Sequence, residues 1–399
     1  MLAELRERFF SPSRSASPLT IGIELELIPV FAESRLPALP TSVEAESTTS
    51  ILSRLGHAEG WREEIVGDDP PAWILADGAR ISFEPGGQIE IGSAPAASAS
   101  AVIAAIQTLV AQIRAAMQTA GVELLSTGVD PFNDIDAVPL QLRRDRYARM
   151  TRFFESIGAS GVRMMRQTAA VQINIERGHD PLPRWRLLNS LAPYIVALFA
   201  NSALYAGKKT GHASYRAHLW RTLDPSRTGL PYDAGDPAKR YLDFALDAKA
   251  IATEQDGSRT FREWMRGGAP GEADWVFHLS TLFPEIRPKE FFEIRSADAI
   301  DPDSLAAAVV FITGLVYDDG AASRAASLLR EPSEELLVRA GKAGVDDPAI
   351  RGMLRALTDL AVAGATSLGD SYLSAEDIRV AREYFARVVD RASRSANTQ

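Results

Sequence analysis

The chain has 399 residues, of which 46% are hydrophobic and 24% are charged, as in an ordinary globular protein. Its formal net charge of −9 argues against a nucleic acid or an anionic membrane as the main partner. The chain contains no cysteine, which excludes disulfides, thiol nucleophiles and thiolate metal ligands. The N-terminal segment lacks the apolar core of a signal peptide, and the longest apolar run, 191–200, is far shorter than the ~20 residues that span a bilayer. These features predict a cytoplasmic protein.

The periodicity of apolar residues predicts both helices and strands. In chain order, we expect a helix at 2–10, a loop at 11–18, a strand at 20–31, a helix at 44–55, strands at 73–75 and 80–84, a helix at 98–120 and a strand at 122–128. The second half should contain a helix at 143–157, a strand at 168–176, an apolar helix at 185–205, a basic loop at 207–229, a strand at 291–295 and helices over 302–394. The Asp77-Gly78 dipeptide is typical of a hairpin, so these strands should form a meander rather than a parallel βαβ unit.

Polar side chains recur at every second position in several of the predicted strands, so the members of each pair share one face. The pairs are Glu24 and Glu26, Gln88 and Glu90, Gln172 and Asn174, and Glu293 and Arg295. A solvated face would explain any single strand, but it explains four strands less well. Buried carboxylates need a cation or a hydrogen-bond network. Oxygen ligands from Glu, Gln and Asn suit Mg²⁺, with Mn²⁺ as an alternative, so the pattern indicates a metal site.

Basic residues gather in the second half of the chain, where guanidinium groups could hold carboxylates or phosphates. They are Arg216, Arg221, Arg227, Arg287 and Arg295. Solvated surface charge is the alternative, and we favour it for Arg221. Neither GxxxxGK[ST] nor GxGxxG occurs, so ATP would be held by metals and arginines rather than by a phosphate-binding loop. His278 could be a core or loop histidine as readily as a catalytic one.

Residues 81–95, ISFEPGGQIEIGSAP, resemble the signature of the glutamate–cysteine ligases of the plant and proteobacterial type, together with their actinobacterial relatives of the ergothioneine pathway. Further blocks resemble the same family in the same order: IGIELEL, RYARM, GVRMMRQTAAVQINIE, LFANSALYAGKKTGHASYRAHLWRTLDPSRTG and DWVFHLSTLFPEIRPKEFFEIRSAD. Together they extend over roughly 21–298. Three positions, Phe132, Arg166 and Ala203, differ from the pattern that is usual in this family.

The resemblance implies a glutamine synthetase-like α+β fold, in which a curved and mostly antiparallel sheet carries the active site and helices pack on its outer face. We expect one catalytic domain over 1–399, with 302–394 as its helical C-terminal part. The implied activity is the ATP-dependent joining of the γ-carboxylate of glutamate to the amine of cysteine through γ-glutamyl phosphate, with Mg²⁺. Glutamate is better supported as donor than cysteine as acceptor. The alternatives are another acceptor amine, a paired-carboxylate hydrolase, or a non-catalytic binding protein of the same fold.

The resemblance also implies roles for individual residues. The metal ligands would be Glu24, Glu26, Glu84, Glu90, Gln172 and Glu293. Arg295 would contact the transferred phosphate, with Glu293 as the second catalytic residue. Arg287, Arg216 and Arg227 lie in blocks that bind the substrate carboxylate or the nucleotide. None of the three positions that differ from the family is among these residues.

Overall fold

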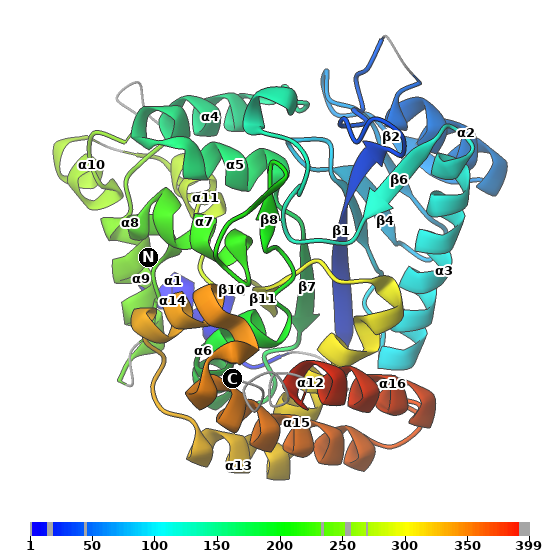
Figure 1. Ribbon diagram of the computed structural model, residues 1–399. Helices are drawn as coiled ribbons and strands as arrows, with labels where there is room; N and C mark the ends of the chain where they lie inside the picture. Colours follow the sequence, from blue (N-terminus) through cyan, green and yellow to red (C-terminus); the bar gives the residue numbers. More distant parts are fainter. Residues whose placement is uncertain are drawn as a thin grey trace.

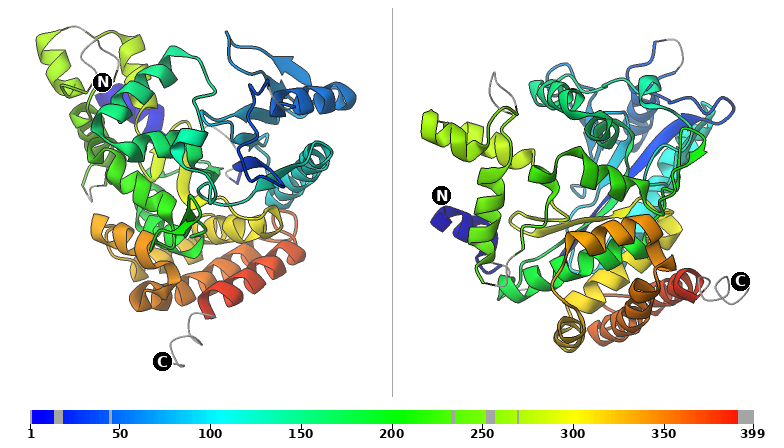
Figure 2. Two further views of the ribbon diagram at one scale, coloured as in Figure 1. Left: turned by 45° about the horizontal axis from the view of Figure 1, so that its top comes forward. Right: turned by 60° about the vertical axis from the view of Figure 1, so that its left-hand side comes forward.

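The computed structural model describes residues 2–13, 19–43, 46–232, 235–251, 257–268 and 270–390 (Figures 1 and 2). Nine of its strands form one sheet, in the order β10-β11-β7-β1-β5-β4-β3-β2, with β6 paired to the far end of β1. These strands are β1 (Ile21–Phe31), β2 (Arg62–Glu64), β3 (Ala72–Ile74), β4 (Arg80–Phe83), β5 (Ile89–Gly92), β6 (Val122–Leu125), β7 (Ala170–Ile175), β10 (Ile286–Pro288) and β11 (Phe292–Asp298). Every pairing is antiparallel, which confirms the predicted meander and fold class.

Helices surround this sheet (Figure 1). In the first half of the chain they are α1 (Leu2–Phe10), α2 (Thr48–Glu59), α3 (Ala99–Gln118), α4 (Asp145–Ile157), α5 (Ala159–Gln167) and α6 (Pro181–Leu198). In the second half they are α7 (Tyr215–Leu223), α8 (Pro225–Thr228), α9 (Pro237–Asp247), α10 (Phe261–Gly267), α11 (Glu272–Ser280), α12 (Leu305–Val316), α13 (Asp319–Leu328), α14 (Glu334–Ala343), α15 (Pro348–Leu368) and α16 (Ala375–Phe385). Two short strands, β8 (Leu204–Tyr205) and β9 (Lys208–Lys209), form a separate hairpin.

The apolar face of the sheet packs on helices because strand residues alternate in direction. Ile23, Leu25 and Leu27 of β1 are fully buried, whereas Glu24 and Glu26 between them point to the opposite face. Helix α3 packs on β1 and β6, α6 packs on β11, and α12 contacts both helices. All twelve residues of α12 are buried, as expected of a core helix. One hydrophobic core therefore connects the sheet to the C-terminal helices.

One helix of the described chain, α3, is long and apolar enough to cross a membrane by length and composition alone, with a mean hydropathy of 1.4. Its buried stripe includes Val102, Ile106, Leu109 and Ile113, which belong to the same core as the sheet. Ser98 accepts a hydrogen bond from the backbone N–H of Ala101 and begins the helix as a cap. The packing is that of an amphipathic helix on a sheet.

The structure also differs from the sequence predictions. The region 207–229, expected to be a basic loop, contains β9, α7 and α8, and the helix expected to reach Tyr205 ends at Leu198. Pro225 occupies the first turn of α8, where a missing backbone N–H costs nothing. The first two residues of the helix expected at 44–55, the end of the loop at 11–18, and residues 391–394 lie outside the described residues.

Candidate active site

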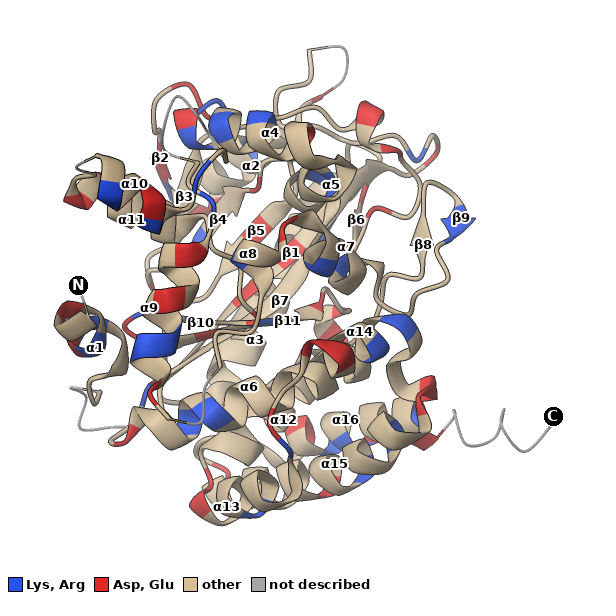
Figure 3. Cartoon of the chain, turned by 90° about the vertical axis from the view of Figure 1, so that its left-hand side faces the viewer, with Lys and Arg blue, Asp and Glu red and all other residues tan. Residues whose placement is uncertain are grey.

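A cavity of about 720 Å³ opens over the polar face of the sheet. Its floor consists of strand residues from β1, β5, β7 and β11, and Figure 3 shows acidic residues on β1 and β5 at the centre of the molecule. Its walls come from α1, α4, α5, α7, α9 and α11. The cavity therefore combines a floor fixed by the backbone ladder of the sheet with walls drawn from six helices.

The register of the sheet brings the predicted acidic residues together. Glu26 lies opposite Glu90 across β1 and β5, and Glu24 lies opposite Gln172 across β1 and β7. On the next strand, Glu293 lies opposite Asn174. Directly opposed side chains of antiparallel strands have Cβ atoms about 5 Å apart, so neighbouring strands place these groups in contact range.

A turn adds Glu84 to this group. It spans Pro85, Gly86 and Gly87 and is closed by two backbone hydrogen bonds, from the Glu84 N–H to the Gln88 carbonyl and from the Gly87 N–H to the Glu84 carbonyl. A Cβ atom on Gly86 would lie 1.8 Å from the carbonyl oxygen of Arg166, so only glycine fits there. The Gln88 side chain accepts from the Gly86 N–H and donates to the carbonyl of Thr168. Gln88 therefore holds the turn against α5 and β7.

Glu26, Glu84 and Glu90 form a three-carboxylate cluster in which one oxygen of each lies within 4.8 Å of the others. Burial, together with the charge of Glu90, raises the pKa of Glu26 to about 7. Burial and the charges of Glu90 and Glu26 raise the pKa of Glu84 well above its ordinary value. Burial, followed by the charges of Glu293 and Glu90, also raises the pKa of Glu24. Among the described residues, no basic side chain forms an ion pair with the three-carboxylate cluster, so the cluster is suited to a bound cation.

Glu293 lies beside the cluster but belongs to a different arrangement. Its buried carboxylate forms ion pairs with Arg287 at 2.5 Å, Lys289 at 2.5 Å and Arg295 at 2.8 Å. Burial alone would raise the pKa of Glu293, but these three cations hold it well below its ordinary value. In this structure Glu293 anchors the basic residues, and its role as a metal ligand stays a prediction.

Gln172 hydrogen-bonds both to the three-carboxylate cluster and to the basic residues around Glu293. Its amide Nε2 donates to Glu26 at 2.9 Å, and its Oε1 accepts from Arg295 at 2.5 Å. The oxygen expected to bind a metal thus faces a guanidinium. Glu24, the remaining predicted ligand, accepts a hydrogen bond from the Asn174 amide at 2.8 Å and lines the cavity.

The predicted arginines separate into two groups. Arg216, Arg287 and Arg295 line the cavity. Arg227 does not line it, which corrects the prediction that this residue binds substrate or nucleotide. It is fully buried and donates to Asp224 at 2.9 Å, to the Thr281 carbonyl at 2.9 Å and to the Lys249 carbonyl at 2.7 Å. Its charge is balanced by Asp224, so Arg227 stabilises the fold around α8.

The surface assignment favoured for Arg221 was also wrong, because its largely buried side chain pairs with Glu285 at 3.0 Å and with Glu334 at 3.1 Å. His278 is a core histidine: it hydrogen-bonds the Ala245 carbonyl at 2.6 Å and stacks on Phe261. Burial lowers the pKa of His278 to about 4, so the ring is neutral at physiological pH.

Several cavity residues were missed by the sequence reasoning. Arg8 and Phe9 come from α1, and Arg146 and Tyr147 come from α4. The RYARM block contains Arg146, so the signal for that residue was present in the motif. Arg146 donates to the Ser280 carbonyl at 2.8 Å. Burial lowers the pKa of Arg146, and the charge of nearby Glu84 opposes this shift. No motif indicated Arg8.

Three of the seven methionines also line the cavity: Met150, Met164 and Met165. Together with Trp220, Tyr241 and Phe283, they give the walls an apolar part beside the charged floor. Methionine side chains are flexible and polarisable, so they adapt to the shape of a bound molecule.

Comparison with known proteins places this geometry in a family. The model of glutamate-cysteine ligase family 2 matches residues 20–387. The glutamate–cysteine ligase EgtA of Mycolicibacterium smegmatis is 33% identical over 327 residues, which are 76% of this chain and 75% of that protein. Glutamate–cysteine ligase A, chloroplastic, of Oryza sativa subsp. japonica is 32% identical over 295 residues, which are 69% of this chain and 60% of that protein. The chain therefore spans less than two thirds of the rice relative.

The fold is similar to a solved structure as well. The crystal structure of glutamate–cysteine ligase from Francisella tularensis in complex with AMP has a TM-score of 0.52 at 14% identity, over 95% of this chain and 93% of that one. At this identity the likeness shows the fold, and it confirms the predicted sheet-and-helix architecture. With the family match covering 20–387, the chain belongs to glutamate-cysteine ligase family 2, as its sequence blocks predicted.

Proposed function

We propose that the protein is an ATP-dependent ligase that joins the γ-carboxylate of glutamate to the amine of cysteine. The observation that carries the proposal is the division of one cavity into a three-carboxylate cluster and a basic group of Arg287, Lys289 and Arg295. Phosphoryl transfer to a carboxylate brings several negative charges together, and positioned cations are the main means of stabilising them. Family membership supplies the choice of reaction.

The donor set fits a hard divalent cation. Glu26, Glu84 and Glu90 offer closely spaced oxygens. Burial and their mutual repulsion raise the pKa values of Glu26 and Glu84, and a cation between them would remove the repulsion. Mg²⁺ is the expected ion and Mn²⁺ the alternative, with Glu24 as a neighbouring ligand. When bound, the ion would neutralise and orient the phosphates of ATP.

The reaction then needs no covalent bond to the enzyme. The γ-carboxylate of glutamate attacks the terminal phosphorus of ATP, ADP leaves, and γ-glutamyl phosphate forms. The deprotonated amine of the acceptor attacks the acyl carbon, and inorganic phosphate leaves as the amide bond forms. Arg295 and Arg287 are held beside Glu293 at the β11 edge of the floor, where their charge can stabilise the transferred phosphoryl group. The apolar part of the walls would reduce the access of water to the acyl phosphate.

The donor side of the reaction is better supported than the acceptor side. The donor side rests on floor residues that match the family blocks, whereas the wall residues Arg8 and Phe9 precede the matched range. The cytoplasmic location, and the absence of nucleic-acid and membrane partners, remain predictions.

The test is ADP release by the purified protein with ATP, Mg²⁺ and glutamate, measured with and without cysteine. We expect ADP release to rise when cysteine is added, and a γ-glutamylcysteine mass to appear in the product. If ADP release rises only with another amine, the protein is still a ligase, and that amine replaces cysteine as the acceptor. No nucleotide turnover with any amino-acid pair would refute the proposal and favour a binding protein of the same fold.

A further inference from the structure

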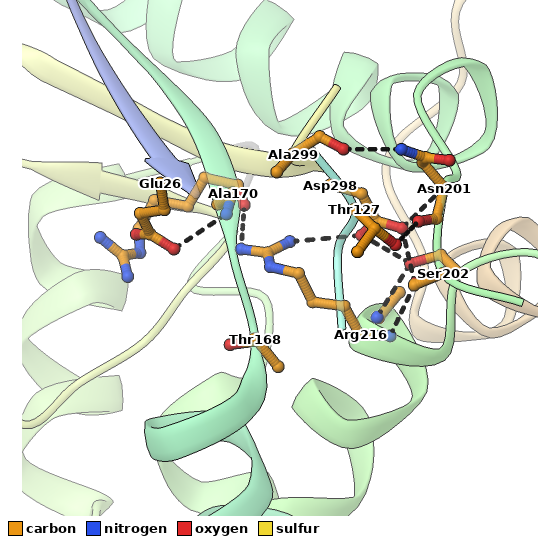
Figure 4. A network of polar contacts seen from close by, with 12 residues as sticks. Glu26, Thr127, Thr168, Ala170, Asn201, Ser202, Arg216, Asp298 and Ala299 are labelled. Carbon is orange, nitrogen blue, oxygen red and sulfur yellow. Dashed lines mark hydrogen bonds and ion pairs between the residues drawn. The ribbon is translucent and has the colours of Figure 1, made fainter. Parts of the chain in front are cut away.

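Behind the cavity, a buried carboxylate joins three segments of the chain (Figure 4). Asp298, at the end of β11, is 1% exposed and does not line the cavity. Its Oδ2 accepts from the Ser202 hydroxyl at 2.7 Å and from the Asn201 N–H at 2.8 Å, and its Oδ1 accepts from the Ser214 hydroxyl at 2.9 Å. A buried carboxylate that accepts three hydrogen bonds is held firmly in one position.

Ser202 and Ser214 connect Asp298 to the beginning of α7 through hydrogen bonds. Ser214 is the N-cap residue of α7, and its Oγ accepts from the Ala217 N–H at 3.0 Å while its hydroxyl donates to Asp298. The Oγ of Ser202 accepts from the Arg216 N–H at 3.1 Å. The negative charge of Asp298 therefore lies at the N-terminal end of α7, where the helix dipole favours it.

Arg216 lies in the first turn of α7 and lines the cavity. Its side chain is 4% exposed, and one of its nitrogens lies 3.9 Å from Asp298. Another of its nitrogens donates to the Arg295 carbonyl at 2.8 Å, and the guanidinium lies over the ring of Trp220 at 4.7 Å. Asp298 therefore acts on both the backbone and the charged group of Arg216.

We propose that Asp298 is a positioning residue, which holds α7 and the Arg216 guanidinium in place so that Arg216 can meet an anionic group of the substrate. The part of this inference that concerns substrate rests on the proposed function. The part that concerns α7 does not, because it follows from the hydrogen bonds of Asp298, Ser202 and Ser214.

The chain offers graded variants and a matched control. Asp298→Asn keeps the volume and most hydrogen bonds but removes the charge that faces Arg216. Ser214→Ala keeps that charge and removes the cap. Asp347→Asn is the control, because Asp347 also caps a helix, α15, and pairs with an arginine, Arg339, but lies outside the cavity.

The first measurement is hydrogen exchange, which needs no substrate. We expect the amides of Arg216 and Ala217 to exchange faster in Asp298→Asn and in Ser214→Ala, and to be unchanged in Asp347→Asn. Unchanged exchange in both Asp298→Asn and Ser214→Ala would overturn the inference, whatever the enzyme does.

The second measurement is a double-mutant cycle on kcat/KM. Asp298→Asn should lower kcat/KM by about tenfold to a hundredfold, as expected for a displaced catalytic-site group. When Asp298→Asn is added to Arg216→Gln, kcat/KM should fall by less than about twofold, because the arginine through which Asp298 acts is already absent. Equal losses in the two backgrounds would refute positioning of Arg216 by Asp298. An inactive wild type would instead count against the proposed function and leave the exchange result to decide.

Discussion

Glu90→Gln should make the metal-free protein more stable while removing its activity. One oxygen of Glu90 lies within 4.8 Å of oxygens of both Glu26 and Glu84. Two unit charges at that distance repel by about 3 kcal/mol at an effective dielectric constant of about 20. Because the pKa of Glu26 is raised to about 7, its charge is only partly present at neutral pH, which reduces the gain. We expect the free energy of unfolding to rise by about 1 to 3 kcal/mol.

The assay is urea unfolding of wild type and Glu90→Gln in EDTA and in Mg²⁺, together with ADP release. Mg²⁺ at a hundred times its Kd should stabilise the wild type by about 2.7 kcal/mol, and the variant by much less. Glu123→Gln is the control, because Glu123 is an exposed carboxylate that pairs with Arg35 outside the cavity. A variant that is less stable than wild type in EDTA, or that responds equally to Mg²⁺, would show that the three carboxylates do not form a cation site.

Other residues give predictions of different kinds. Gly86→Ala should lower the free energy of unfolding by about 3 kcal/mol because the new Cβ would meet the Arg166 carbonyl. Gly352→Ala is the control: Gly352 lies in α15 with open space around it, so this change should raise the free energy of unfolding slightly in the same urea titration. The pKa of His278 falls to about 4 on folding, so only the unfolded chain gains this proton between about pH 6.5 and 4, and wild-type stability should drop by up to about 3 kcal/mol across that window. His278→Gln should remove this part of the pH dependence, and an unchanged slope would contradict the burial argument. Arg8→Gln should raise the KM of an anionic substrate about tenfold with kcat maintained, and unchanged KM values for every substrate would exclude Arg8 from binding.

The floor of the site could be predicted from the sequence because strand parity is a local property. Glu24 and Glu26 alternate with buried apolar residues on β1, and Glu90 does so on β5, so the polar face of each strand follows from period two. The register of β1 with β5 then places Glu90 opposite Glu26. Glu84 follows from the motif around its turn. The same reasoning could not separate Arg216 from Arg227, since both lie in one basic block and only the packing of α7 and α8 directs one into the cavity and the other into the core.

The walls could not be predicted for a related reason. Arg8 and Arg146 lie far apart in sequence, and both reach the cavity only because their helices pack around it. Helix α7 was missed because its capping residue, Ser214, follows a glycine-containing and basic stretch that is typical of loops. In each case the local sequence pattern does not determine the structure, and contacts between distant segments do.

The division of the cavity into a sheet floor and helical walls has an evolutionary consequence. A substitution in a floor strand disturbs paired neighbours on both sides, so drift there is constrained by several residues at once. The wall helices are separate segments, and α1 even precedes the part of the chain that the family model matches. A substitution in one wall helix can therefore change the shape of the cavity without disturbing the strand pairing of the floor.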